Sequence, residues 1–330
     1  MTRRALFTAA VMLLAVVGRA QAADPAPMSL TLNFLAGGPQ AGFMYAKKLG
    51  FYTAAGIDLT IIEGKGSATT AQLVATGQTD VGFADAPAAM QIRSKGGPVT
   101  IIAPILQTNG FAIISLEEAA IKSPADLIGK KVAVQPGTAQ TTLLDAIFAA
   151  NKIDKDKVDI INIDPAALVG ALLEKKVDAI LAGADFQSVQ IRDRGFKVTD
   201  LFYRDVGVPT VGLSIIARED KLKAAPELYK KFIDASLKGW DAARKNPEAA
   251  SEAVVEQFPS ATKDQILKQL KVDLLLVCAP GAKALGRVPD ENWRITYELL
   301  TSYLGLPKEA PITNYYSNDY LPASPPGCPS

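Results

Sequence analysis

Histidine is missing from all 330 residues of this sequence. Its side chain is the usual general base near neutral pH and the commonest metal ligand. The absence excludes Ser-His-Asp and Cys-His catalysis, and it removes most transition-metal sites as well. We therefore expect no catalytic residue, no metal site and no cofactor, and an enzyme is only the third choice of function class.

An excess of one charge is also missing, because 35 basic residues face 34 acidic residues. No basic patch points to a nucleic acid partner. Nucleotide-binding patterns are incomplete: GKGS at 64–67 lacks the full G-x-x-x-x-G-K-[ST] motif, and no G-x-G-x-x-G follows a predicted strand. We expect neither nucleic acid nor nucleotide as a ligand.

Long apolar runs are few. The run at 5–18 is too short for a membrane span, which needs about 20 residues. It follows Arg3 and Arg4 and precedes the small residues AQA at 20–22, the pattern of an export signal. We expect residues 1–22 to be removed near Ala22 and the mature chain to be periplasmic and soluble.

Cysteine occurs only twice, at Cys278 and Cys328. An exported protein is in a compartment that permits disulfides. One bridge pinning the Pro-rich end of the chain and two free thiols both remain open, because sequence does not show the geometry that a bridge needs.

One pattern is present twice. TDVGFADA at 79–86 is echoed by VDAILAGAD at 177–185. Each follows a helix-like stretch and a strand-like segment, IDLTIIEG at 57–64 or VDIINID at 158–164. The match is of a strand–helix–strand unit, and it predicts two similar α/β lobes.

Strands and helices alternate along most of the chain, which favours parallel pairing and an α/β fold. The predicted strands are 28–35, 57–63, 80–84, 99–106, 111–116, 131–135, 158–163, 178–183 and 212–220. The predicted helices are 40–56, 67–77, 86–96, 123–129, 138–151 and 165–176. Residues 226–304 are mostly helical, and the Pro-rich tail at 305–330 adds no further element.

Two long segments resemble a known family. They are NFLAGGPQAGFMYAKKLGFYTAAGIDLTIIEGKGSATTAQLVATGQTDVGFADA at 33–86 and SPADLIGKKVAVQPGTAQ at 123–140. Both are similar to the periplasmic solute-binding proteins of ABC importers, in the branch that takes up nitrate, sulfonates, taurine and thiamine-precursor pyrimidines. The resemblance covers about residues 28–220 and is weak beyond them.

The resemblance implies a two-lobed, type II-like clamp. Each lobe would carry a mixed, mainly parallel sheet flanked by helices, with two hinge strands between the lobes. The implied division is residues 24–109 with 214–304 for one lobe, 110–213 for the other, and 305–330 as the tail. Hinges are expected near 108–111 and 212–214.

The resemblance also implies a small-molecule ligand, an ABC permease in the inner membrane as partner, and a monomer. The pyrimidine-synthesising relatives of this branch depend on histidine and a cysteine-rich motif, and this sequence has neither. Binding without turnover is therefore expected. A periplasmic sensory adaptor that uses the same clamp is the alternative from another class.

Ligands of open α/β sheets bind beyond the carboxyl ends of the strands, where helix N-termini present free N–H groups. In this chain those positions are the loops 33–40, 64–69, 84–87, 107–110, 135–140 and 183–186. The candidate ligand-binding residues within them are Asn33, Phe34, Gly38, Gln40, Gly66, Ser67, Asp85, Gln107, Asn109, Gln135, Gly137, Thr138, Asp185 and Phe186.

Charge separates two ligand classes. The loops offer one base, Lys65, against the carboxylates of Asp85 and Asp185. A carboxylate about 4 Å from an anion costs on the order of 4 kcal/mol at an effective dielectric of 20. We therefore prefer a neutral or cationic ligand over an oxyanion such as an alkanesulfonate, taurine or nitrate, which stays the alternative.

Aromatic residues in the loops suggest the shape of that ligand. Phe34 and Phe186 could stack on a flat ring, which favours a nitrogen heterocycle such as a thiamine-type pyrimidine or a flavin. A purely structural role also remains open for these residues. Ser67, Asp85 and Asp185 could cap the helices beside them, and the phenylalanines could pack in the core.

Overall fold

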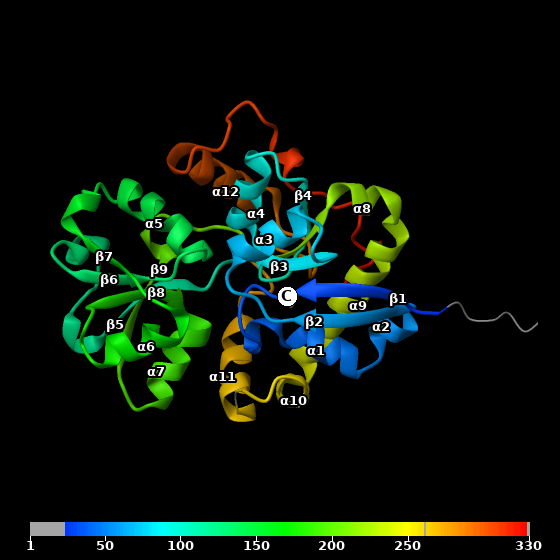
Figure 1. The fold of residues 1–330 in the computed structure, drawn as a ribbon, viewed down its shortest axis with the longest axis horizontal. Helices are drawn as coiled ribbons and strands as arrows, with labels where there is room; N and C mark the ends of the chain where they lie inside the picture. The colour runs from blue at the N-terminus through cyan, green and yellow to red at the C-terminus, as the bar shows by residue number, and fades with distance from the viewer. Residues whose placement is uncertain (1–23, 261, 329–330) are drawn as a thin grey trace, which may run out of the picture.

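Two separate five-stranded sheets form the two lobes of the chain, as the ribbon in Figure 1 shows. The structure is a computed structural model that describes residues 24–260 and 262–328. The predicted export signal at 1–22 lies outside the described residues. The expected fold class, an α/β protein with two mixed sheets flanked by helices, is confirmed.

The first sheet has the strand order β2-β1-β3-β10-β4. Strands β2, β1 and β3 are parallel, and β10 runs antiparallel to both of its neighbours. The strands are β1 (Ala26–Thr31), β2 (Ile57–Ile62), β3 (Val81–Asp85), β4 (Val99–Pro104) and β10 (Leu213–Arg218).

The second sheet repeats this plan with the order β7-β6-β8-β5-β9. Here β7, β6 and β8 are parallel, and β5 is antiparallel to β8 and β9. The two similar sequence segments, 79–86 and 177–185, contain β3 and β8, and these strands hold the same position in the two sheets. The strands are β5 (Phe111–Leu116), β6 (Lys131–Val134), β7 (Asp159–Asn162), β8 (Ala179–Gly183) and β9 (Val198–Phe202).

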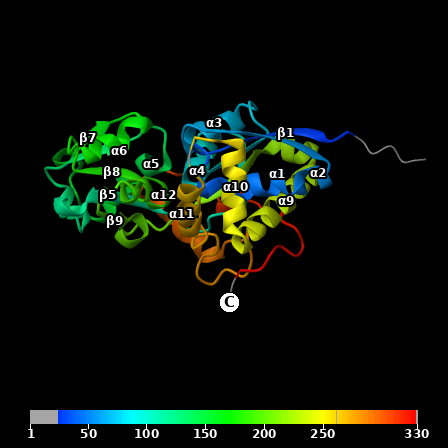
Figure 2. The ribbon, with the colours of Figure 1, turned by 90° about the horizontal axis from the view of Figure 1, so that it is seen from below.

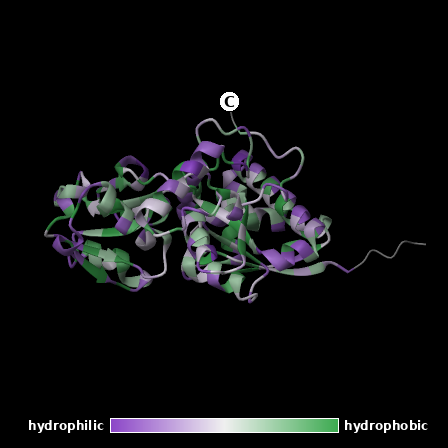
Figure 3. Cartoon of the chain, turned by 90° about the horizontal axis from the view of Figure 1, so that it is seen from above, coloured by the Kyte–Doolittle hydropathy of each residue, from purple (hydrophilic) through white to green (hydrophobic). Residues whose placement is uncertain are grey.

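Helices cover both faces of the first sheet. Phe43 of α1 packs against both Phe83 of β3 and Trp240 of α9 in one core, and Ala71 of α3 and Met90 of α4 belong to another. Figure 3 shows that the strands are mostly hydrophobic and that polar residues gather on the outer helices. The helices are α1 (Ala41–Lys48), α2 (Phe51–Ala54), α3 (Ser67–Ala75), α4 (Ala86–Ser94), α5 (Ala139–Ala150), α6 (Pro165–Leu173), α7 (Val189–Asp193), α8 (Glu219–Ala224), α9 (Pro226–Lys245), α10 (Pro247–Gln257), α11 (Lys263–Asp273) and α12 (Asp290–Tyr303).

Two of the predicted elements need correction, and one strand was missed. The single helix expected at 40–56 is wrong, because Gly50 adopts a φ of 75° and separates α1 from α2. The helix expected at 123–129 is only a 3₁₀ turn, η3 (Pro124–Leu127). Strand β9 was not predicted, since it is a half-buried edge strand without a continuous apolar run.

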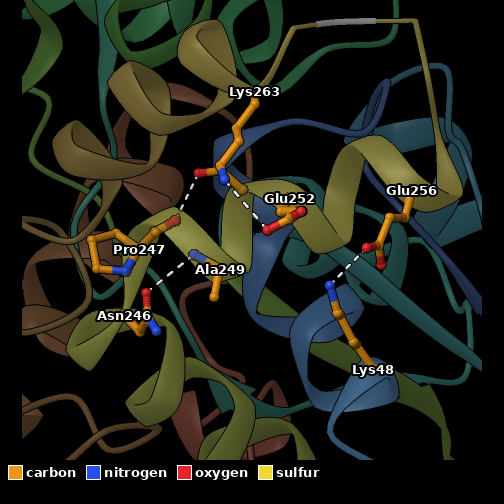
Figure 4. Close-up of polar contacts among 8 residues, drawn as sticks. Lys48, Asn246, Pro247, Ala249, Glu252, Glu256 and Lys263 are labelled. Carbon is orange, nitrogen blue, oxygen red and sulfur yellow. Dashed lines mark hydrogen bonds and ion pairs between the residues drawn. The ribbon is translucent and has the colours of Figure 1, made fainter.

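Helix α10 holds α11 in place (Figure 4). Lys48 of α1 pairs with Glu256 at 2.7 Å, and Lys263 of α11 pairs with Glu252 at 3.3 Å. The side chain of Asn246 caps the start of α10 by accepting a hydrogen bond from the Ala249 N–H. Helix α11 lies at the junction of the two lobes, where it packs on α10 and also on α7 of the second lobe (Figures 1 and 2).

Two chain segments cross between the sheets, from β4 to β5 and from β9 to β10. They lie side by side: the Asn109 N–H donates to the Thr210 carbonyl at 3.2 Å, and the Gly212 N–H donates to the Leu106 carbonyl at 3.1 Å. A Cβ atom on Gly212 would lie 2.6 Å from the Thr108 carbonyl oxygen, so the crossing needs glycine there.

The C-terminal segment is tied back to the first lobe. Cys278 and Cys328 form a disulfide, so the bridged alternative is the one found. Ile101 of β4 makes a parallel bridge to Tyr316, and the Leu285 N–H donates to the Pro326 carbonyl at 2.8 Å. Within 24–260 and 262–328, no helix has the length and apolar character needed to cross a bilayer.

Candidate ligand-binding site

A cavity of about 70 Å³ lies between the lobes. The first lobe contributes the loop after β1 and the segments around the start of α3 and the end of β3. The second lobe contributes β8 and the segments that follow β6 and β8. The lobes touch beside the cavity, because the Ala68 N–H donates to the Gly137 carbonyl at 3.1 Å.

Most of the predicted binding residues line this cavity, although they come from five separate loops. A larger outer groove of about 890 Å³ adjoins the cavity and shares Phe34, Gln135, Phe186 and Gln187 with it. The predicted residues on the cavity wall are Asn33, Phe34, Gln40, Gly66, Ser67, Asp85, Gln135, Thr138, Asp185 and Phe186.

Gln107 and Asn109 lie elsewhere, buried in the first crossing segment. The Gln107 side chain donates to the Ala284 carbonyl at 2.9 Å and accepts from the Ala279 N–H at 3.1 Å. The Asn109 side chain donates to Thr210 Oγ1 at 2.8 Å. Their polar groups satisfy the backbone and side chains of the crossing rather than facing the cavity.

Gly38 and Gly137 also stand outside the cavity lining. A Cβ atom on Gly38 would lie 2.3 Å from the Leu270 N atom, so Gly38 allows α11 to pack closely on the loop after β1. Gly137 provides the carbonyl that Ala68 contacts across the lobes. Both glycines therefore shape the junction without lining the cavity.

Asp85 and Ser67 form the polar centre of the first-lobe wall. Asp85 is 3% exposed, and its Oδ2 accepts a hydrogen bond from Ser67 Oγ at 2.8 Å. The Asp85 N–H donates back to Ser67 Oγ at 3.1 Å, while Asp85 Oδ1 has no donor among the described residues. Burial raises the pKa of Asp85 to about 7; the Ser67 bond offsets part of this rise and the charge of Asp185 adds to it.

The capping roles considered from sequence do not hold. Ser67 is the first residue of α3, whose cap position is Gly66, and its side chain faces Asp85. Asp85 occupies the cap position of α4, but its side chain makes no capping bond. The Asp85 carboxyl group is thus left available to the cavity.

Asp185 forms the matching part of the second-lobe wall. It lies in a π-helical turn, η5 (Ala184–Ser188), directly after β8, and is 9% exposed. Such turns occur often at functional sites. Burial raises the pKa of Asp185, and the neighbouring carboxyl group of Asp273 counteracts part of the rise.

Phe34 and Phe186 meet across the lobes. Their ring centroids are 5.6 Å apart and the ring planes are at 89°, an edge-to-face contact. Both rings line the inner cavity and the outer groove. The pair therefore stands between the two spaces, and neither phenylalanine is packed in the core of its lobe.

The remaining predicted polar residues are partly engaged within the protein. Gln40 Nε2 donates to Asn33 Oδ1 at 2.8 Å, and Gln40 Oε1 accepts from the Gly37 N–H at 2.9 Å. Thr138 caps α5 by accepting from the Thr141 N–H, and it donates to the Gln135 carbonyl at 2.9 Å. These bonds fix the shape of the wall.

Sequence reasoning missed an apolar part of the wall and two glutamines. Phe111 and Leu213 start the strands that follow the crossings, a position that the predicted hinges could have suggested. Nothing in the sequence placed Leu168 of α6 there, because helical spacing does not show which face meets the other lobe. The lining residues not predicted are Pro39, Phe111, Gln140, Leu168, Leu181, Ala182, Gly183, Gln187 and Leu213.

The charge of the wall is one-sided. Across the described residues, its only ionisable side chains are the carboxyl groups of Asp85 and Asp185, without a lysine or arginine. No cluster of His, Cys, Asp or Glu suited to a metal ion occurs in the described ranges. The cavity can accept hydrogen bonds from a ligand, stabilise positive charge and enclose apolar surface.

Comparisons with known proteins agree with this architecture. "Riboflavin-binding protein RibY" of Chloroflexus aurantiacus is 25% identical over 92% of this chain and 90% of its own. "4-amino-5-hydroxymethyl-2-methylpyrimidine phosphate synthase" of Legionella pneumophila is 23% identical over 90% of this chain and 93% of its own.

A solved structure shares the fold. The periplasmic aliphatic sulphonate binding protein SsuA from Escherichia coli superposes with a TM-score of 0.68 at 17% identity, covering 88% of this chain and 92% of its own. The fold is thus that of the periplasmic binding proteins. The model of the family described as "NMT1/THI5 like" matches residues 39–250. Since this match spans more than half of the sequence, the chain belongs to the NMT1/THI5-like family.

Proposed function

We propose that this chain is the periplasmic ligand-binding component of an ABC importer and that it encloses a small, flat nitrogen heterocycle. The observation that carries the proposal is the acidic wall. Asp85 Oδ1 is buried without a donor, and Asp185 faces the same cavity from the other lobe. A ring that carries amino or hydroxyl groups would supply the missing donors.

The alternative ligand, an oxyanion, is less well supported. Binding a sulfonate or nitrate would bring negative charge against Asp85 and Asp185 with no basic side chain on the described wall. The fold that this chain shares with SsuA does not carry ligand identity with it.

The size of the cavity favours one ring over several. A water centre needs about 10–15 Å³, so a cavity of about 70 Å³ has room for roughly five waters. That space suits a substituted pyrimidine. A flavin would have to extend past the Phe34–Phe186 pair into the outer groove.

Binding without turnover is the better reading of the chemistry. One relative is named for binding riboflavin and another for making a pyrimidine phosphate. This chain has no histidine and only two cysteines, both of which are in a disulfide. Those side chains are therefore not available for general-base or nucleophilic chemistry.

Clamp closure would be the mechanism. A ligand that contacts both Asp85 and Asp185 binds the closed conformation better than the open one. It therefore shifts the equilibrium toward the closed conformation. The two crossing segments would bend as hinges, near 108–111 and 212–214. Both cavity walls come from one chain, so a monomer is sufficient, and the permease would receive the closed form.

Isothermal titration and thermal shift with a ligand panel test the proposal. The panel is 4-amino-5-hydroxymethyl-2-methylpyrimidine, riboflavin, taurine and nitrate. We expect the pyrimidine to bind and stabilise the chain, and Asp85→Asn to weaken it about 10-fold to 100-fold, since a hydrogen bond to a charged group contributes roughly 1.5–3 kcal/mol. Asp58→Asn, the same change on the exposed face of β2, is the matched control.

Stabilisation by taurine or nitrate alone would contradict the proposal. Mass spectrometry of each ligand after incubation with the protein tests turnover, and a changed mass would favour an enzyme. A sensory adaptor would be favoured if the ligand-bound protein associated with a receptor kinase and not with a permease.

A further inference from the structure

Asp273, the last residue of α11, is completely buried without a hydrogen-bond donor. It is 0% exposed, and neither of its carboxyl oxygens has a hydrogen-bond partner among the described residues. Its ionisable neighbour is Asp185, which lies in η5, and α11 packs directly against η5. Two ionised carboxylates have no hydrogen to share, so a bond between them requires one proton.

The pair joins the two lobes. Asp273 belongs to a helix whose Ile266 and Leu270 pack in the first-lobe core. Asp185 belongs to η5 of the second lobe, and α11 packs directly on η5 and α7 (Figures 1 and 2). Any opening of the clamp at this junction would separate the two carboxyl groups.

Within 24–260 and 262–328, no lysine or arginine forms an ion pair with Asp185 or Asp273. On α11, Lys268 binds Asp193 and Asp264, Lys263 binds Glu252, and Lys271 is exposed to solvent. On α7, Arg192 binds Asp200. The loop after β1 offers uncharged Gly37 and Gly38, and α10 directs Glu252 and Glu256 to lysines. The remaining charged group that faces the pair is Asp85, an acid across the cavity.

The surroundings are otherwise apolar or neutral. A Cβ atom on Gly110 would lie 3.5 Å from Asp185 Oδ1 and 3.0 Å from Leu276 Cδ1, so the space beside the pair is filled. One turn before Asp273, Gln269 Oε1 accepts from the Gly38 N–H at 3.0 Å, and Gln269 Nε2 has no acceptor among the described residues. Burial, followed by the nearby charge of Asp185, raises the pKa of Asp273 well above its usual value.

We propose that Asp185 and Asp273 hold one proton between them in the closed clamp, and that this proton sets both the charge of the ligand site and the pH range of closure. In the open clamp both groups are hydrated carboxylates. Closing takes one proton from solvent and forms an O–H···O⁻ bond, mainly with the proton on Asp273. One negative charge remains, and Asp185 presents it to the cavity.

This inference deepens the proposed function because it concerns the same site, but its test needs no ligand. Small-angle scattering gives the radius of gyration of the ligand-free protein at pH 5, 6, 7 and 8. We expect a compact protein at low pH and a more open one as the pH rises. Closing takes up one proton in the pH range where the open form is fully ionised. In that range the equilibrium constant for closing should fall about tenfold for each unit of pH.

Two variants test whether the shared proton causes the pH dependence of closure. Asp273→Asn replaces the shared proton by an amide N–H that donates to Asp185, so the chain should stay compact from pH 5 to 8. Asp185→Asn should do the same from the other lobe. Asp264→Asn, on the same helix but exposed and paired with Lys268, should follow the wild type and serves as the control.

A wild-type radius of gyration that does not change with pH would overturn the proposal. So would Asp273→Asn and Asp185→Asn opening at the same pH as the wild type. Failure of every heterocycle in the ligand panel would refute the proposed ligand and leave this result unaffected.

Discussion

Ser67 and Asp85 hydrogen-bond to each other twice across the start of α3 and the end of β3. The hydroxyl group donates to Oδ2 at 2.8 Å and accepts from the Asp85 N–H at 3.1 Å. Strand and helix are thereby locked together at the cavity wall, and the buried carboxyl group keeps one donor.

Ser67→Ala should destabilise the protein, and more so at high pH. At pH 8 Asp85 is mostly ionised, so the variant loses a charge-assisted bond of about 1.5–3 kcal/mol. At pH 5 the loss should be about 1 kcal/mol, that of a neutral bond. Urea unfolding at the two pH values measures this. Ser94→Ala, which removes a hydroxyl from the end of α4, should show no such difference.

Asp85→Asn should change how stability depends on pH. The pKa of Asp85 is about 7 in the folded state against an ordinary value of 3.8, so the folded chain binds this proton more tightly. The wild type should lose stability relative to the variant as the pH rises from about 4 to about 7, by roughly 4 kcal/mol in all. A constant difference between pH 4.5 and 8 would contradict this assignment.

Gly212→Ala should destabilise the crossing by about 1–3 kcal/mol, because the added Cβ meets the Thr108 carbonyl oxygen at 2.6 Å. Gly170→Ala is the matched change in open space on α6, and it should stabilise by about 0.5–1 kcal/mol. Chemical unfolding of both variants checks the signs. Equal effects would mean that the crossing relaxes freely.

Reduction of the disulfide should lower stability by about 2–4 kcal/mol, since the bridge closes a loop with a sequence separation of 50. Thermal unfolding with and without reductant measures the loss. A variant with serine at both positions 278 and 328 should match the reduced wild type and should not respond to reductant.

The general fold could be predicted well from the sequence, because strands and helices are indicated by residue patterns within short segments. Alternating strands and helices fix the α/β class, and the two echoed segments occupy matching places, β3 and β8, in two sheets. Asp85 ends β3 and Asp185 follows β8, at the carboxyl ends of the strands where ligands of such sheets bind. The position of such a site depends on the geometry of the sheet alone, so the two aspartates could be proposed before the tertiary structure was known.

The errors at the site come from tertiary packing. Gln107 and Asn109 have the composition of ligand-binding residues, but a chain crossing also needs side-chain amides to satisfy its buried backbone. Asp273 is the opposite case. It lies on a helix far along the chain, and only the packing of α11 on η5 brings it to Asp185.

The order of the first sheet has a consequence for biosynthesis. Strand β10 lies between β3 and β4, although more than a hundred residues separate it from β4 in the sequence. During synthesis β4 has no neighbour to pair with until the whole second sheet has been made. The first lobe can therefore complete its sheet only after the second lobe has been synthesised, so the second lobe is free to fold first.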